Sequence, residues 1–327
     1  MKKTAIALST ILSLGLVTQL EAAKPESVQA HELVELFEKL SGKHPGLRKA
    51  HASGVCATGS FMPNSEAGPF ADAPLLSSGE LPVSVRFSMG GGNPNADERT
   101  PGTRGMAVQI TLEDGSRHIF TGNNFPVFAG KDPETFFGFL STLLPDENGQ
   151  RNPQKTMEYI KAHPSVQANA AWNQQAKTAY SYANTEFFGL HTFFYNSGDE
   201  SVMFRWHISP DLGVKTMETE QAKSLETPFL AQRLTEQLAD GTVSFSLNVS
   251  LGEEGDAIND PSSQWPGGRQ VVNLGKITLK SAGGDDCTGI NFDPNVLSQG
   301  FKPSNDPVLK MRSTAYAISF GKRLSGQ

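Results

Sequence analysis

The side chains most suggestive of chemistry lie near the end of the chain, at Arg312, Tyr316 and Arg323. Intervals of four and seven residues place all three on one face if the segment is helical. Fixed positive charge beside a tyrosine favours its phenolate form, and a phenolate is a known axial ligand of haem iron. The same spacing also fits a surface stripe that packs against the rest of the protein. The segment alone therefore leaves a cofactor ligand and a structural stripe both open.

Polar residues upstream could supply the rest of a site. His51 lies among small residues that would let it approach a flat cofactor closely, although a single histidine is more often structural. Arg86 and Ser88 alternate with apolar residues and so share one face of a strand. That face is either exposed to solvent or lines a polar pocket inside a barrel. Asn123 and Asn124 precede Phe-Pro, a pattern that ordinarily forms a turn.

Apolar periodicity indicates the elements that must position these side chains. Period-two alternation, interrupted by Gly, Pro and Asp turns, favours an antiparallel sheet closed as a barrel or a sandwich. The predicted strands are 83–88, 106–112, 202–208, 243–251 and 270–279. The predicted helices are 31–40, 133–144, 153–163, 220–238 and 307–324. The pattern indicates an α+β fold, with one barrel-like domain that carries inserted and C-terminal helices.

The ends, charge and cysteines of the chain bound its class. Residues 1–23 combine a Lys-Lys start, an apolar run and a small-residue exit, which is typical of a secretory signal. We therefore expect a periplasmic protein whose single domain spans 24–327, without a membrane span. The net charge of −6 and the lack of a basic cluster argue against a nucleic-acid partner. Cys56 and Cys287 could pair in an oxidising compartment, but their distance in the sequence leaves this open.

Six short motifs occur in the order and approximate spacing of the haem catalase core. They are His51-Ala-Ser-Gly, Val85-Arg-Phe-Ser88, Arg104-Gly-Met-Ala-Val, Gly122-Asn-Asn-Phe-Pro-Val-Phe, Asp132-Pro and Arg312-xxx-Tyr316. Each motif is modest alone, but six in order are specific. The chain resembles this family from about residue 30 onward, and more narrowly the short catalase-related peroxidases. The resemblance implies a catalase-type antiparallel β-barrel, haem b as cofactor and peroxide as substrate; it leaves a homo-oligomer open.

The resemblance also assigns roles to individual positions. On the distal side of the haem, His51 matches the essential histidine, Asn123 the asparagine, and Ser88 the serine that orients the histidine ring. Tyr316 matches the iron ligand. The positions that match other haem contacts are Arg48, Arg86 and Arg323 for the propionates, Arg312 beside the tyrosine, Phe136 on the distal side and His191 near the proximal side.

These residue types suit peroxide chemistry. A neutral histidine can take a proton from one peroxide oxygen and return it to the other. Only eleven residues follow Tyr316, so we expect a more open haem pocket than in larger catalases. Such a pocket favours a peroxidase that uses a small organic electron donor, with weak catalase activity. The alternatives are a haem isomerase of fatty acid hydroperoxides that resembles allene oxide synthase, and a non-enzymatic haem carrier.

Overall fold

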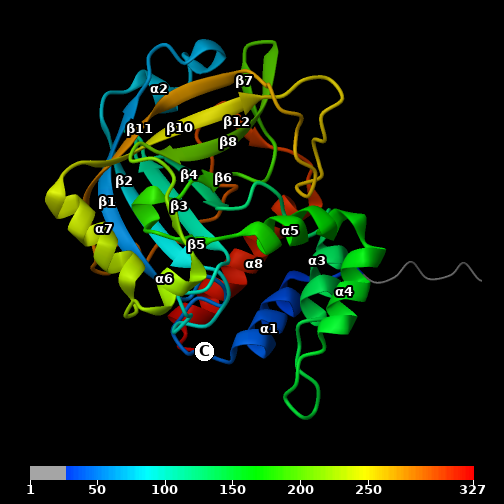
Figure 1. Ribbon diagram of the computed structural model, residues 1–327. Helices are drawn as coiled ribbons and strands as arrows, with labels where there is room; N and C mark the ends of the chain where they lie inside the picture. The colour runs from blue at the N-terminus through cyan, green and yellow to red at the C-terminus, as the bar shows by residue number, and fades with distance from the viewer. Residues whose placement is uncertain (1–26) are drawn as a thin grey trace, which may run out of the picture.

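A closed antiparallel barrel forms the body of the protein (Figure 1). The computed structural model describes residues 27–327, so the predicted signal at 1–23 lies outside the described residues. Strands pair in the order β10-β11-β1-β2-β3-β4-β6-β8, and β8 pairs back onto β10 to close the ring. β7 and β12 extend the sheet from β8. The predicted α+β class and antiparallel barrel are confirmed.

The strand bounds follow the apolar pattern closely. The barrel strands are β1 Gly54–Pro63, β2 Leu81–Met89, β3 Arg104–Thr111, β4 Arg117–Asn123, β6 Phe187–Phe188, β8 Glu200–Pro210, β10 Val243–Leu251 and β11 Val271–Ala282. The others are β5 Thr178–Ala179, β7 Phe193–Ser197, β9 Thr216–Met217 and β12 Phe301–Pro303. All five predicted strands fall on these elements.

The inside of the barrel is apolar. Val85 and Phe87 on β2 are fully buried and join a core cluster that draws on most of the barrel strands. Arg86 and Ser88 alternate with them and therefore face outward. The interpretation of this face as the lining of a pocket inside the barrel is wrong, because bulky apolar side chains fill the interior. Helices cover the outer face instead, so it is not simply exposed to solvent.

Helices pack around the outside of the barrel. The α-helices are α1 Ala30–Ser41, α2 Pro74–Ser77, α3 Pro133–Ser141, α4 Pro153–Ala162, α5 Pro164–Gln175, α6 Thr219–Lys223, α7 Phe229–Asp240 and α8 Pro307–Leu324. Two short 3-10 turns are η1 Gly68–Phe70 and η2 Tyr182–Asn184. α1, α3 and α8 contact one another beside the barrel (Figure 1). Each described helix is too short or too polar to cross a bilayer.

The predicted helix 220–238 is wrong as one element. The structure divides it into α6 and α7, with residues 224–228 between them. Pro228 has no amide hydrogen to donate, and its ring would clash inside a continuous helix. The chain therefore breaks before this proline and resumes at Phe229, where α7 packs against β11.

α8 is built from local signals. The side chain of Asp306 accepts hydrogen bonds from the amides of Val308 and Leu309, and Pro307 occupies the first helical position. Lys322 and Arg323 lie in the last turn, where positive charge suits the helix dipole. The predicted bounds 307–324 are confirmed.

A disulfide joins Cys56 on β1 to Cys287, 231 residues later. The two Cα atoms lie 5.4 Å apart, within the usual range for such a bond. Both cysteines are buried, in a small cluster with Phe292 where the segment 283–296 meets the barrel. The bond therefore fixes this segment to the outer face of the barrel.

Candidate active site

The strand register brings polar and small side chains into two rows on the outer face of the barrel. One row is Ser88, Gly105 and Asn123, and the next is Arg86, Ala107 and Thr121. These residues belong to β2, β3 and β4, neighbouring strands of one sheet. Because alternate residues share a face, the separate sequence motifs become one surface.

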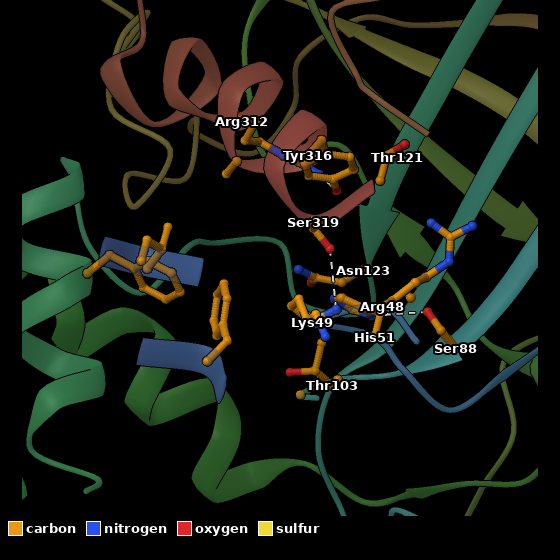
Figure 2. Close-up of a pocket in the computed structure, with 18 of the residues that line it drawn as sticks. Arg48, Lys49, His51, Ser88, Thr103, Thr121, Asn123, Arg312, Tyr316 and Ser319 are labelled. Carbon is orange, nitrogen blue, oxygen red and sulfur yellow. Dashed lines mark hydrogen bonds between the residues drawn. The ribbon is translucent and has the colours of Figure 1, made fainter. Parts of the chain in front are cut away.

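A cavity of about 520 Å³ lies between this surface and helices α1, α3 and α8. Nine of the ten predicted site residues line it, namely Arg48, His51, Arg86, Ser88, Asn123, Phe136, Arg312, Tyr316 and Arg323. Tyr316 and Arg312 approach from α8, opposite His51 and Asn123 (Figure 2). His191 does not line the cavity.

His51 has a conformation that its surroundings must maintain. Its φ is 55°, in the left-handed region that costs an ordinary residue about 1–3 kcal/mol. Nδ1 of its ring lies 3.0 Å from Oγ of Ser88 (Figure 2). The tautomer in which Nδ1 donates to Ser88 leaves Nε2 as a free acceptor. A Cβ on Gly105 would lie only 2.8 Å from Nδ1, so glycine is needed for this close approach.

The charge state of His51 suits a base. Burial, followed by the positive charges of Arg86, Arg312 and Arg48, lowers its pKa from 6.5 to about 4. The imidazole is therefore neutral at neutral pH and can accept a proton.

The two adjacent asparagines have different tasks. Oδ1 of Asn123 accepts a hydrogen bond from the amide of Phe125 at 2.8 Å, which leaves the Nδ2 hydrogens to donate to a ligand. Asn124 links the strands instead, because its Oδ1 accepts from the amide of Arg104 and its Nδ2 donates to the carbonyl of Gly102. Asn124 thereby fixes the end of β4, where Asn123 lies.

On the opposite side, Tyr316 has a charged partner in its own helix. Nη2 of Arg312 donates to the phenolic oxygen at 2.7 Å. The two residues are four apart, so the helix itself brings them together. Tyr316 lines the cavity, and a tyrosine oxygen is a known ligand of haem iron.

His191 supports this helix from behind the cavity. Its Nδ1 lies 2.6 Å from Oδ2 of Asp306, whose other carboxylate oxygen caps α8. Both side chains are almost fully buried. Burial lowers the pKa of His191, although Asp306 opposes the change. His191 was predicted to lie near the proximal side. The structure places it against Asp306, the residue that caps α8.

Three arginines make one edge of the cavity strongly positive. Arg48 donates to the carbonyls of Cys287 and Ile290, and Arg86 donates to that of Ala52. Nη2 of Arg323 is buried without a partner among residues 27–327.

Neutral carbonyls leave this charge uncompensated. Burial, followed by Arg86 and Arg323, lowers the pKa of Arg48 to about 9, and burial lowers that of Arg86 to about 10. Bidentate donors in such a setting suit carboxylates. The edge therefore fits the two propionates of a haem.

Aromatic and aliphatic side chains provide the flat, apolar part of the cavity. Phe136 on α3 packs against Phe128 with 4.5 Å between ring centroids, and against Phe37 on α1 at 6.4 Å. Leu33, Val34 and Leu40 continue this wall along α1. The apolar wall, the charged edge and the Tyr316 phenol together match the chemical parts of a haem.

Sequence reasoning missed several supporting residues. Asp306 could have been found, because Asp306-Pro307 is a typical helix start, with an aspartate at the cap and a proline at the first helical position. No local signal marks Gly105, whose role depends on the ring of His51 across a strand pair. Lys49 was also missed, since a lysine in a polar segment normally lies in solvent.

The chain is similar in sequence to known proteins. A model of the catalase family matches residues 17–327. The catalase-related peroxidase of Synechococcus elongatus is 36% identical, over 98% of this chain and 96% of that protein. The catalase-related peroxidase of Mycolicibacterium paratuberculosis is 32% identical, over 88% of this chain and 92% of that protein.

Solved structures share the fold. A fungal catalase has a TM-score of 0.75 at 21% identity, over 96% of this chain and 67% of its own. Catalase A from Saccharomyces cerevisiae has a TM-score of 0.72 at 20% identity, over 96% and 68% of the two chains. At this identity the likeness concerns architecture alone.

Proposed function

The chain belongs to the catalase family, and on this basis we propose that it is a haem b-dependent peroxidase that reduces hydrogen peroxide or organic hydroperoxides with a small organic electron donor. The family and its relatives make it an oxidoreductase that acts on peroxide. The observation that carries the proposal of a haem peroxidase is that the His51–Ser88 pair lies across one cavity from the Arg312–Tyr316 pair. A haem carrier would need the second pair but not the first.

The bound haem would supply an iron that accepts and donates the electrons needed to cleave the peroxide O–O bond. Tyr316 would hold the iron, and Arg48, Arg86 and Arg323 would hold the propionates. Neutral His51 would take a proton from the peroxide at Nε2 and return it to the departing oxygen. Nδ2 of Asn123 would donate to a peroxide oxygen and orient it. For each peroxide, the electron donor supplies two electrons and two protons. Hydrogen peroxide then gives two waters, and an organic hydroperoxide gives one water and one alcohol.

Two observations support a peroxidase over an efficient catalase. The relatives at 36% and 32% identity are both named catalase-related peroxidases. The apolar lining of the cavity also continues along α3 past Phe136, to Phe139 and Leu140, and such a surface suits an organic molecule. We also propose a weak catalase activity, because the distal base His51 and the amide of Asn123 are both present.

Haem reconstitution with optical spectroscopy tests this proposal. We expect Tyr316→Phe to change the ferric spectrum, and His51→Ala to lower peroxide turnover by about 10²–10⁴-fold while haem stays bound. Tyr180→Phe is the matched control, because Tyr180 also packs against cationic side chains, Lys215 and Arg233, but does not line the cavity. An unchanged spectrum in Tyr316→Phe would exclude it as the ligand.

Steady-state assays then separate the activities. Peroxide consumption should rise with an added phenolic donor and remain slow without one. Rapid oxygen release from hydrogen peroxide alone would instead identify a catalase. Conversion of a fatty acid hydroperoxide without any donor would identify an isomerase.

We also propose that residues 1–23 direct export to the periplasm. Fractionation of producing cells, with sequencing of the mature N-terminus, tests this. Mature protein that keeps residue 1 and stays in the cytoplasm would contradict it.

A further inference from the structure

Lys49 is a buried lysine between two residues of the site, Arg48 and His51. Only 4% of its surface is exposed. Its ammonium donates to the backbone oxygens of His44 at 3.2 Å and Gln327 at 2.6 Å, and lies 3.3 Å from the carboxylate of Glu38. An ammonium has three hydrogens to donate, and three protein acceptors use them. Lys49 therefore has none to offer a ligand, unlike the arginines of the charged edge.

Glu38 connects Lys49 to α8. It is buried on α1, and its second carboxylate oxygen accepts from Lys322 of α8 at 2.7 Å. Burial alone would raise the pKa of Glu38, but hydrogen bonds from Lys322 and Lys49 hold it below its usual value. The ionised carboxylate thus lies between two ammonium groups. We call Lys49, Glu38 and Lys322 the Lys49 cluster.

The backbone near Lys49 is also held from both sides. Its amide donates to Oγ of Ser319 on α8 at 3.3 Å (Figure 2). On the other side, a Cβ on Gly92 would lie 2.5 Å from the carbonyl oxygen of Lys49, so only glycine allows this contact. The amide of Ala52 donates to the carbonyl of Gly91. The segment is thereby enclosed between α8 and the glycine run that follows β2.

This enclosure matters because residues 42–53 belong to no helix or strand. His51 has a positive φ that no local hydrogen-bond ladder imposes. A residue in such a conformation persists only when its surroundings determine it. Lys49, two residues away, contacts Glu38 on α1 and Gln327, which follows the end of α8.

We propose that Lys49 is a positioning residue: through the Lys49 cluster it fixes the segment 48–51 against α8 and so keeps His51 opposite Tyr316. The inference rests on the proposed function, since the position of His51 affects turnover only if His51 is the base. It links the two sides of the site through protein contacts, independently of the haem. Loss of the link should therefore be measurable with and without cofactor.

The test uses Lys49→Met, which keeps the aliphatic stem and removes the charge. Lys43→Met is the matched control, because Lys43 is exposed in the same segment. Lys49→Arg is the conservative variant, and Glu38→Gln removes the acceptor side of the cluster. Each protein is studied by amide hydrogen exchange without haem, and by turnover per bound haem after reconstitution.

We expect Lys49→Met to speed exchange in residues 44–53 by about tenfold or more, while exchange in the barrel strands stays as in Lys43→Met. Turnover per haem should fall about tenfold or more, because small misplacements of a catalytic group are costly. The KM for peroxide should change less than twofold. Glu38→Gln should move both measurements in the same direction, and Lys49→Arg should recover most of each.

Two results would overturn the inference. One is unchanged exchange in residues 44–53 of Lys49→Met. The other is a lower melting temperature with wild-type turnover per haem, which would make the lysine merely structural. If Lys49→Met fails to fold, Glu38→Gln decides by the same two criteria. A wild-type protein without peroxide turnover would refute the proposed function instead, and the exchange result would still stand or fall alone.

Discussion

α8 and the segment 48–53 carry the two sides of the site, yet they are held in opposite ways. α8 has a side-chain cap, a proline in its first turn and the hydrogen-bonded Arg312–Tyr316 pair four residues apart. The segment has no regular structure, and its histidine has a positive φ. The side chain of this histidine, His51, is hydrogen-bonded to Ser88, which is 37 residues away in the sequence. The proximal side is therefore specified locally, and the distal side by long-range packing.

This difference predicts which distant changes matter. Substitutions far away in the sequence should disturb His51 and Arg48 while the Arg312–Tyr316 pair stays in place. The proximal side should respond mainly to changes in the cap of α8.

The largest effect should come from removal of the disulfide. Replacement of both cysteines by serine should lower the free energy of unfolding by about 4 kcal/mol, because the bond closes a very long loop. It should also weaken haem binding, since Arg48 donates to the carbonyl of Cys287. Denaturant unfolding and haem transfer to a competing apoprotein measure the two effects.

The control for this change is chemical. Wild-type protein treated with a reductant under unfolding conditions and then refolded should behave like the double-serine variant. Stability lost with haem affinity intact would show that Arg48 does not depend on the segment 283–296.

Gly105→Ala should be next. The new methyl would approach Nδ1 of His51 and Oγ of Ser88 within 3 Å, so the ring must move. Turnover per haem should fall about 10²-fold, equivalent to about 2.7 kcal/mol. The ferric spectrum should remain, because Tyr316 lies on the other side. Gly79→Ala, where a Cβ meets nothing within 4 Å, is the control; equal turnover in both variants would contradict the packing argument.

Asp306→Ala tests the proximal side, which is specified by local signals in α8. It removes the cap of α8 and leaves His191 buried without its partner, which should cost about 2 kcal/mol of unfolding free energy. Asp306→Asn keeps a capping oxygen and should lose less. Exchange of amides in the first turn of α8 should speed up, while that of residues 44–53 should not. Changes of equal size in both segments would mean that the first turn of α8 and residues 44–53 are not held separately.

The same division explains what the sequence could predict. α8 was predicted to the residue, because its first-turn proline and its apolar spacing are local signals. β4 was not predicted. Its middle residues His118, Ile119 and Phe120 are all buried, since the segment 292–298 covers its outer face. Period-two alternation fails where both faces are buried. α5 was missed for another reason: only Val166 is buried, so no apolar stripe marks it.

The site residues could likewise be predicted from spacing only where the signal is local. Spacing alone indicated the face shared by Arg312 and Tyr316. Resemblance, not spacing, joined His51, Ser88 and Asn123 to them, because their meeting depends on the register of three strands. The alternation of β2 correctly separated Arg86 and Ser88 from the apolar residues. It could not place the cavity outside the barrel, since that depends on where α1, α3 and α8 pack.

The smallest predicted effect concerns proton binding by two histidines, His51 on the distal side and His191 next to the start of α8. Below pH 6.5 the unfolded chain protonates His51, whereas the folded apoprotein keeps it neutral down to about pH 4, the value to which burial and nearby arginines lower its pKa. The unfolded state binds more protons in this window, so the free energy of unfolding rises with pH through it.

His51→Gln should therefore reduce the change in unfolding free energy between pH 5 and pH 6 by about 1 kcal/mol. His191→Gln should reduce it less, because the Asp306 carboxylate opposes the effect of burial on the pKa of His191. Urea unfolding of the apoprotein at both pH values gives these differences directly. Equal reductions would mean that charge does not distinguish the two sides, and the contrast between them would then lie in backbone conformation alone.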